Sequence, residues 1–267
     1  MSTFAIFCIM LLVAMAGCSL GFKKYIWFIS IGYGFAIAAL GAAYLIAFHS
    51  GLTAGTVICC CLFIIYGCRL GGYLLYRELK MASYNKNMKG EIKDGTDMKL
   101  APKIALWVST SILYLCETAP VFFRLANGKG SDTVTYVGAA IMVLGICLES
   151  ASDLQKSAMK KTDPNRFCDK GLFKIVRCPN YLGEMTLWTG VFVSGVTALQ
   201  GAVQWVLALI GYLGIVYIMF SGARRLEIRQ NKRYGKDPEY QKYVKTVPIL
   251  LPLVPIYSVE RHKWLVG

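Results

Sequence analysis

Residues 203–222 read VQWVLALIGYLGIVYIMFSG, a stretch with no Asp, Glu, Lys or Arg. A helix of about 20 apolar residues is long enough to cross the hydrocarbon core of a bilayer. The whole chain has a similar character, because 56% of its 267 residues are hydrophobic, its mean hydropathy is +0.50 and only 16% are charged. An average soluble domain has about 25% charged residues. The composition therefore predicts an integral membrane protein, and the quoted stretch predicts one of its spans.

Six further apolar windows are long enough to form transmembrane helices. They cover residues 4–20, 25–48, 52–76, 104–126, 133–151 and 181–198. We expect an all-α polytopic membrane protein built as a bundle of seven transmembrane helices. No long repeat and no low-complexity linker divides the chain, which predicts one membrane domain over residues 1–267. The first window ends in Ala14-Met15-Ala16, which resembles a signal-peptidase site, but no Lys or Arg precedes it, so we expect a retained helix.

The basic residues lie in alternate connections between these windows. The chain has 29 Lys and Arg against 15 Asp and Glu, a net charge of +14. The surplus lies at Lys23 and Lys24 and in residues 77–103, 152–180 and 223–267, whereas the other connections are close to neutral. Basic loops remain in the cytoplasm. We therefore expect an integral protein of a bacterial inner membrane, with its N-terminus outside the cell membrane and its C-terminus in the cytoplasm. The surplus then faces anionic lipid headgroups, and no nucleic-acid partner is needed to explain it.

A few ionisable residues lie inside the predicted spans, where each costs about 2.5–3.5 kcal/mol on insertion scales. In the third window Arg69, Tyr73 and Arg77 recur at helical spacing, with Tyr66 one turn earlier. This spacing predicts a polar stripe that runs toward the cytoplasmic end of the helix. The alternative is that Arg69 extends its side chain to the interface and Arg77 simply ends the helix.

Two further pairs of charges share a helix face. Glu117 and Arg124 lie seven residues apart around Pro120, which predicts either an ion pair or the lining of a cavity in a kinked helix. Glu149 and Asp153 lie four residues apart at the cytoplasmic end of the fifth window, where like charges repel each other. The neighbouring Lys156 and Lys160, the hydroxyl and amide donors of a bound ligand, or solvent would each offset that repulsion.

Residues 171–184, GLFKIVRCPNYLGE, form the most specific string in the chain. Pro179 suits the first position of a helix, and Asn180 and Glu184 then share one face of it. Gly183 allows the close approach of another backbone or of a flat ring. Arg177, together with Lys170 and Lys174, leads a basic stretch into the helix N-terminus, which is a suitable way to hold phosphates. The chain contains neither a glycine-rich dinucleotide fingerprint nor a P-loop.

Histidine and cysteine usage excludes several other chemistries. The chain has two histidines, His49 and His262, which excludes His-rich zinc, haem and di-iron sites, so we expect no metal. Most of the ten cysteines lie inside predicted spans, and no CxxC pair occurs. We therefore interpret the cysteines as small packing residues.

The ordered set of polar motifs resembles the membrane-embedded steroid 5-alpha-reductase-like proteins, and within them a bacterial branch known as a domain of unknown function. The resemblance covers residues 66–252, with the steroid-reductase-like C-terminal region at 133–255. Its pieces are Arg69-Leu70 with Tyr73 and Arg77; Glu149 with Asp153 and Gln155; Asp163-Pro164-Asn165-Arg166; residues 171–184; Ser221-Gly222 with Leu226-Glu227; and Tyr240 and Tyr243 followed by Thr246 and Pro252.

This resemblance implies a seven-helix reductase that uses NADPH to reduce a carbon–carbon double bond conjugated to a ketone in a lipophilic, steroid-like substrate. Membrane lipids are the other implied partners. The basic cytoplasmic face would also attract the polyanionic cofactor. The residues that the motifs and the basic stretch place at the cofactor are Arg77, Asp153, Arg177, Asn180, Tyr181, Glu184, Arg224 and Glu227.

Such a reaction needs a donor that hydrogen-bonds the ketone as it becomes enolate-like. A tyrosine hydroxyl fits this role, as does a carboxylic acid that a dry cavity keeps neutral, and we expect Tyr66 and Glu117 to be the catalytic residues. The animal steroid reductases place a glutamate in their second span, whereas residues 25–48 contain no acidic residue. This departure leaves the catalytic donor and the steroid identity of the substrate open.

Two other classes of function remain. Isoprenylcysteine-type and phospholipid methyltransferases share a similar C-terminal helix and loop with an Arg-His-Pro string, and bind S-adenosylmethionine; here Cys178 occupies the histidine position. A non-enzymatic lipid-binding protein would account for the spans but not for polar groups that gather at one face. The Gly183-Glu184 continuation favours the reductase.

Overall fold

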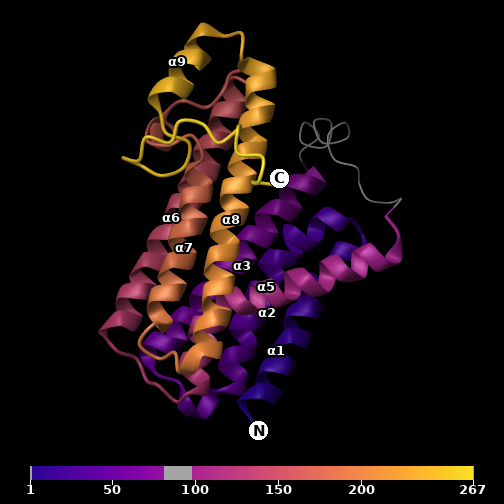
Figure 1. Cartoon of the computed structure of the whole chain (residues 1–267), viewed down its shortest axis with the longest axis vertical. Helices are drawn as coiled ribbons and strands as arrows, with labels where there is room; N and C mark the ends of the chain where they lie inside the picture. The colour runs from indigo at the N-terminus through magenta and orange to yellow at the C-terminus, as the bar shows by residue number, and fades with distance from the viewer. Residues whose placement is uncertain (1, 81–97, 267) are drawn as a thin grey trace. The chain divides into compact units, whose positions relative to one another are not determined.

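The computed structural model describes residues 2–80 and 98–266, and every regular element in these two ranges is helical (Figure 1). This confirms the all-α expectation for the described part of the chain. Residues 81–97, most of the predicted basic segment 77–103, lie outside the described residues. The α-helices are α1 (Thr3–Cys18), α2 (Ile31–Ala47), α3 (Ala54–Lys80), α5 (Leu100–Ala126), α6 (Thr133–Thr162), α7 (Pro179–Gly195), α8 (Gly201–Tyr234) and α9 (Pro238–Thr246).

Within the described residues, five helical segments are long and apolar enough to cross a membrane. They are Thr3–Phe22, Ala54–Lys80, Leu100–Ala126, Thr133–Thr162 and Gly201–Tyr234. The other two predicted windows form α2 and α7, which have 17 residues each. Window 25–48 is shorter as a helix than expected, because Ser30 has a non-helical backbone (φ −135°, ψ −90°) that separates α2 from the 3-10 helix Tyr25–Ile29.

Three of the long helices continue beyond their apolar windows into polar sequence. α3 ends at Lys80, α6 at Thr162 and α8 at Tyr234, whereas the apolar windows end near residues 76, 151 and 222. These extensions carry many of the polar residues that the sequence predicts to form a site. Hydropathy alone locates the membrane-embedded part of a helix and not its end.

The chain folds into two compact units. Unit 1 contains residues 1–139 and 191–211, and unit 2 contains residues 140–190 and 212–267. In unit 1, α2 and α3 pack with their backbones in close approach. A Cβ atom on Gly67 would lie 2.2 Å from the carbonyl oxygen of Gly34, so only glycine fits there, as is common where helices pack within membranes.

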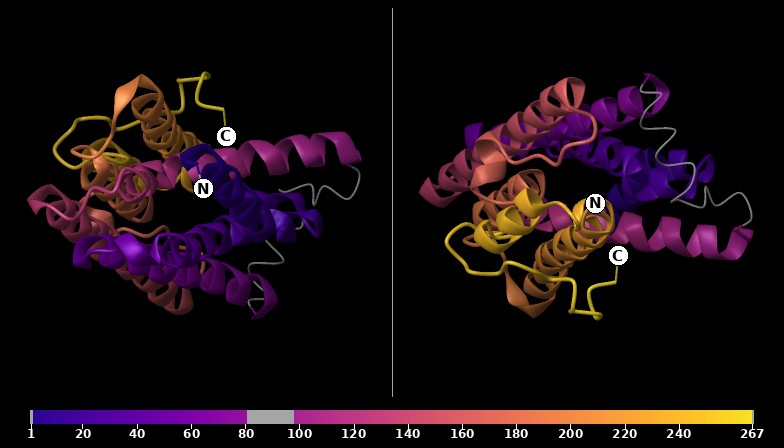
Figure 2. Two further views of the ribbon diagram at one scale, coloured as in Figure 1. Left: turned by 90° about the horizontal axis from the view of Figure 1, so that it is seen from below. Right: turned by 90° about the horizontal axis from the view of Figure 1, so that it is seen from above.

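Unit 2 consists of parts of α6, α7 and α8 together with α9 and the post-α9 segment, defined as residues 247–266. α7 packs against α6, where a Cβ atom on Gly145 would lie 2.3 Å from the amide nitrogen of Leu187. It also packs against α8, where the hydroxyls of Thr189 and Tyr212 are 3.1 Å apart. The post-α9 segment lies beside α8 in the views of Figures 1 and 2.

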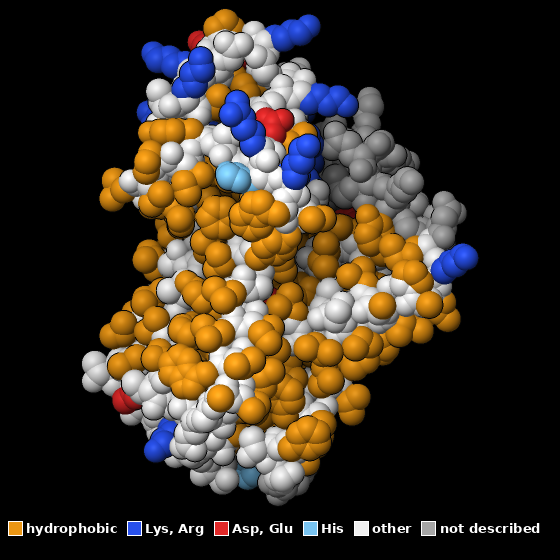
Figure 3. Space-filling view, viewed as in Figure 1, with side chains coloured by type: hydrophobic (Ala, Val, Ile, Leu, Met, Phe, Trp, Pro, Cys, Tyr) orange, Lys and Arg blue, Asp and Glu red, His pale blue; other side chains and the backbone are white. Residues whose placement is uncertain are grey.

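The surface over α8 and α9 changes character along its length (Figure 3). Hydrophobic side chains cover the middle of α8, and Lys and Arg side chains gather over α9 and the adjoining end of α8. α9 begins with Asp237 as its N-cap, whose carboxylate accepts hydrogen bonds from the amides of Glu239 and Tyr240, followed by Pro238 in the first turn.

Candidate functional site

Main-chain amides of the loop before α7 donate hydrogen bonds to α6 and to the post-α9 segment. Gly171 adopts a positive φ of 60°, a conformation that favours glycine, and starts the 3-10 helix Gly171–Lys174. The amide of Leu172 donates to the Gln155 side chain on α6 at 2.9 Å. The amides of Arg177 and Cys178 donate to the carbonyls of residues 248 and 249 at 2.9 and 3.0 Å. α7 then begins at Pro179, as predicted.

The Arg177 side chain forms a buried ion pair with Glu227 of α8. The Nη2 and Oε1 atoms are 2.8 Å apart, and the two side chains are 2% and 3% exposed. Nη2 of Arg177 also donates to the carbonyl oxygen of Tyr257, and Oε2 of Glu227 accepts from the amide of Val259 at 2.9 Å. The pair therefore links the start of α7, the extension of α8 and the post-α9 segment.

Arg224, one turn before Glu227 on α8, also binds the post-α9 segment. Its Nε donates to the carbonyl of Glu260 at 2.9 Å and its Nη1 to the carbonyl of Leu265 at 3.2 Å. Three of the residues predicted to lie near the cofactor are thus brought together, and all three hold the post-α9 segment.

Two tyrosines of α9, Tyr240 and Tyr243, bind α8 and the loop before α7. The Tyr240 hydroxyl donates to Oδ1 of Asn231 at 2.7 Å, and the Tyr243 hydroxyl donates to the carbonyl of Phe173 at 2.7 Å. Burial raises the pKa of Tyr240 to about 12, against the opposing effect of the Arg177 charge, and burial also raises the pKa of Tyr243. Both phenols therefore stay neutral at physiological pH and act as hydrogen-bond donors.

Cys178, which stands in place of the histidine of the Arg-His-Pro string, is buried. Burial raises the pKa of its thiol to about 12, although the Arg177 charge partly opposes the shift. The thiol is therefore protonated near neutral pH, which makes it a poor nucleophile. All ten cysteines are free thiols, in keeping with a packing role.

The remaining predicted residues of unit 2 gather at the crossing of α6 and α7. A Cβ atom on Gly183 would lie 2.5 Å from the amide nitrogen of Glu149, so the predicted close approach is confirmed and its partner is backbone. Glu149 and Glu184 are 4% and 8% exposed and lie at this level on neighbouring helices. α6 and α7 run in opposite directions, so Asp153, one turn later on α6, lies near the level of Asn180.

Tyr181 points from α7 toward α8. A Cβ atom on Gly222 would lie 3.3–3.4 Å from its ring and hydroxyl, so the phenol lies against the α8 backbone at a position with no side chain. Asn180 and Tyr181 are half-buried, as is Asp153. Unit 2 thus brings carboxylate, amide and phenol groups from α6 and α7 to one end of its helices.

The predicted catalytic residues belong to unit 1. Tyr66 of α3 is fully buried, and its hydroxyl donates to the hydroxyl of Tyr33 at 3.3 Å. The Tyr33 ring lies 4.6 Å from that of Tyr114, one turn from the buried Glu117 on α5. Arg77 is half-buried in the last turn of α3. Neither Tyr33 nor Tyr114 was predicted from the sequence, although the i, i+3 spacing of Tyr114 and Glu117 was a usable signal.

Arg124 has partners other than Glu117. Its Nε donates to the carbonyl of Ser194 at 2.8 Å, and Nη2 lies 3.2 Å from Oδ2 of Asp132 and also donates to Thr197. The guanidinium is 2% exposed. Of the two alternatives for Glu117 and Arg124, the ion pair between them does not form, because Asp132 in the following loop reaches the guanidinium.

The Asp132 carboxylate is stabilised in its charged form. Partial burial raises its pKa, but hydrogen bonds from Thr197 and Thr135 and the charge of Arg124 outweigh this effect and hold the pKa well below its usual range. Asp132 therefore stays ionised under all ordinary conditions. The ion pair of Asp132 with Arg124 joins the end of α5 to the start of α6 within unit 1.

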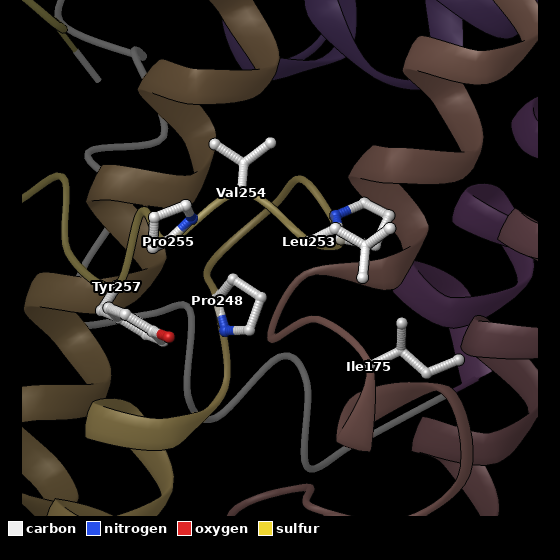
Figure 4. A pocket seen from close by; sticks show the side chains of 7 residues that line it. Ile175, Pro248, Leu253, Val254, Pro255 and Tyr257 are labelled. Carbon is white, nitrogen blue, oxygen red and sulfur yellow. The ribbon is translucent and has the colours of Figure 1, made fainter.

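A small apolar hollow lies between the loop before α7 and the post-α9 segment (Figure 4). It has a volume of about 260 Å³. Its lining consists of Ile175, Pro248, Pro252, Leu253, Val254, Pro255 and Tyr257. These side chains come from the loop before α7 and from the post-α9 segment, and they provide contact surface but few groups capable of chemistry.

A protein family described as "Protein of unknown function (DUF1295)" matches residues 21–247. Neither a curated protein nor a solved structure gives a significant match to the chain. The matched range includes every predicted site residue and covers well over half of the sequence. The chain therefore belongs to the DUF1295 family.

Proposed function

We propose that this protein is a membrane reductase that uses NADPH to reduce a carbon–carbon double bond conjugated to a ketone in a lipophilic, steroid-like substrate. The observation that supports the proposal is the crossing of α6 and α7 at Glu149 and Gly183, which brings Asp153 near the level of Asn180, Tyr181 and Glu184 in the first turns of α7. These last four are the residues that the resemblance to steroid 5-alpha-reductase-like proteins assigns to the cofactor. They lie on adjoining helices although they are up to 31 positions apart in the sequence.

The chemistry of these side chains fits a dinucleotide. Carboxylate and amide oxygens accept hydrogen bonds from ribose hydroxyls and from a nicotinamide amide. The exposed Lys170 and Lys174 precede the N-terminus of α7, where cations and backbone amides suit phosphate oxygens. The α6 and α7 groups would therefore make the direct contacts with NADPH.

Arg177, Arg224 and Glu227 have a different role in this mechanism. Because they bind one another or the post-α9 segment, they stabilise the wall beside the α6 and α7 groups. Their role is to hold the start of α7 in place, so that Asn180 and Tyr181 keep a fixed orientation.

Bound NADPH would supply a hydride for the β carbon of the substrate. The protein must then hydrogen-bond the ketone oxygen as negative charge develops on it and deliver a proton to the α carbon. Tyr66 is the proposed hydrogen-bond donor, and its contact with Tyr33 provides a neighbouring hydroxyl for proton exchange. The carboxylic acid form of Glu117 is the proposed alternative donor.

The proposed setting is a bacterial inner membrane crossed seven times, with the N-terminus outside and the C-terminus in the cytoplasm. α2 and α7 are shorter than the five long apolar segments. At 17 residues each, they lie at the lower limit of about 17–25 residues for a transmembrane helix. The alternation of basic and neutral connections supports this orientation.

The test uses the full-length protein purified and reconstituted in lipid. One reaction contains NADPH and a 3-oxo-4-ene steroid, and a second contains labelled S-adenosylmethionine and a lipid thiol or amine. Steroid-dependent loss of nicotinamide absorbance supports the proposal. Methyl transfer without any NADPH oxidation would replace it with the methyltransferase function.

Isosteric variants locate the cofactor. Asp153→Asn and Glu184→Gln each remove one carboxylate from the α6 and α7 group and should weaken NADPH binding at least tenfold, since a hydrogen bond to a charged group contributes about 1.5–3 kcal/mol. Glu239→Gln is the matched control, because Glu239 is an exposed acid of the same unit that pairs with Arg166. Equal NADPH affinity in all three variants would show that the site lies elsewhere.

A further inference from the structure

The last part of the post-α9 segment, residues 259–266, follows α8 along one face. At the polar end of α8, Nδ2 of Asn231 donates to Oε2 of Glu260 at 2.7 Å, and Oε2 of Glu227 accepts from the amide of Val259 at 2.9 Å. These bonds fix the middle of the segment beside the extension of α8 that leaves the apolar window.

The last described residues of the segment bind α8 much closer to its apolar part. The Tyr217 hydroxyl donates to the carbonyl of Trp264 at 2.8 Å and accepts from the amide of Val266 at 3.2 Å. The Tyr217 and Trp264 rings lie 6.1 Å apart. Arg224 donates to the carbonyl of Leu265 at 3.2 Å. The segment therefore runs back along α8 from residue 231 to residue 217.

This level lies inside the apolar window of residues 203–222. Tyr217 is five residues from the polar end of the window, which corresponds to about 7.5 Å along the helix axis at 1.5 Å per residue. Amphipathic segments at a bilayer surface bury their apolar side about 5–10 Å into the boundary between headgroups and acyl chains. The depth of the Tyr217 contact therefore matches the membrane interface.

The segment has two distinct faces. Val259 and Leu265 point inward and are 2% and 1% exposed, whereas Trp264 and Val266 are 65% and 76% exposed. Tryptophan is enriched at membrane interfaces, where its apolar ring and polar N–H suit a boundary. The exposed basic residues beside it are Arg261, His262 and Lys263.

We infer that residues 260–266 form an interfacial membrane anchor, with Trp264 and Val266 inserted at the headgroup–acyl boundary and with Arg261 and Lys263 against anionic lipid headgroups. The occupant of this exposed surface is lipid, because the hydrogen bonds to Tyr217 hold it against the apolar part of α8. Lys and Arg near an anionic surface strengthen such attachment. This inference does not depend on the proposed reductase activity.

The depth of Trp264 can be measured directly. Full-length protein is reconstituted in vesicles of phosphatidylcholine and phosphatidylglycerol, and Trp264 emission is taken as the difference between the wild type and Trp264→Phe. Because the hydrogen bonds of Tyr217 are to the backbones of residues 264 and 266, this substitution leaves those bonds in place. Lipids brominated near the headgroup or near the chain end serve as quenchers, and Trp188→Phe, at a 1% exposed tryptophan of the same unit, gives the matched control signal.

The anchor predicts that Trp264 is quenched at least twofold more strongly by the shallow bromine than by the deep one, while Trp188 is quenched by neither. Quenching of Trp264 by aqueous iodide but by no brominated lipid would overturn the inference, because the segment would then lie in water. Protection from iodide and from both lipids would also overturn it, because Trp264 would then be covered by protein.

The basic residues are tested by varying the lipid charge. In the wild type, shallow quenching of Trp264 should increase with the fraction of phosphatidylglycerol. The double variant Arg261→Ala/Lys263→Ala should lose most of this dependence and keep the same circular dichroism spectrum. If quenching of Trp264 in the double variant still increased with phosphatidylglycerol as in the wild type, the inferred contacts of Arg261 and Lys263 with headgroups would be wrong.

Discussion

The substitution Glu227→Gln tests whether the buried ion pair holds unit 2 together. The Arg177 and Glu227 side chains are 2.8 Å apart and only 2% and 3% exposed. Glutamine has nearly the same shape and keeps an oxygen that can accept from the amide of Val259. It removes the charge, however, so the guanidinium of Arg177 stays buried without its counter-ion. Loss of one partner of a buried pair costs about 3–5 kcal/mol.

A second ion pair in the same unit provides the control. Arg166 and Glu239 are 2.7 Å apart, almost the same separation, but their side chains are 39% and 67% exposed. Water screens an exposed pair and solvates whichever partner remains. Glu239→Gln should therefore change the free energy of unfolding far less than Glu227→Gln. Arg166 also keeps its ion pair with Asp169 at 2.7 Å, so both exposure and the second counter-ion limit the loss.

The measurement is unfolding of the full-length protein in lipid–detergent micelles, followed by circular dichroism. The double variant Arg177→Met/Glu227→Leu removes both charges and should recover part of the loss, because no unpaired charge stays buried. The recovery is incomplete because the carbonyl of Tyr257 and the amide of Val259 lose their side-chain partners. Equal losses for Glu227→Gln and Glu239→Gln would refute the reasoning. A double variant that is no more stable than Glu227→Gln would also refute it.

Three further outcomes are expected. Gly183→Ala should destabilise the protein by about 1–3 kcal/mol in the same unfolding assay, because its Cβ would meet the α6 backbone at 2.5 Å, whereas Gly72→Ala meets nothing within 4 Å and should have no such cost. The pKa of Tyr240 is about 12 in the folded protein and near 10 in an unfolded chain, so stability should be lost as pH rises from 10 to 12. The variant Tyr240→Phe should show a weaker loss of stability over this pH range. It should also lose about 0.5–1.5 kcal/mol of stability at neutral pH, because the hydrogen bond to Asn231 is absent. The pKa of Asp132 is lowered in the folded protein, so its contribution is present above about pH 4 and lost as pH falls further; a pH titration of unfolding should show a weaker acid limb for Asp132→Asn.

The local features of the candidate site followed from the sequence. Pro179 begins α7, and Gly183 allows close backbone approach, because both properties belong to the residue itself. The i, i+4 spacing of Glu149 and Asp153 placed them on one face of α6 for the same reason. Tyr33 and Tyr114, by contrast, are brought to Tyr66 only by the packing of three helices.

Residue types and their periodicity are enough to predict a helical protein that is apolar enough for a membrane, because these properties act over one or two helical turns. The partners of the buried charges, in contrast, depend on how the helices pack. Arg177 pairs with Glu227, 50 positions away, and Arg124 pairs with Asp132 in place of Glu117. The physical reason is that a buried charge takes whichever counter-charge the packing brings within reach, and helix packing joins residues whose separation leaves no periodic trace in the sequence.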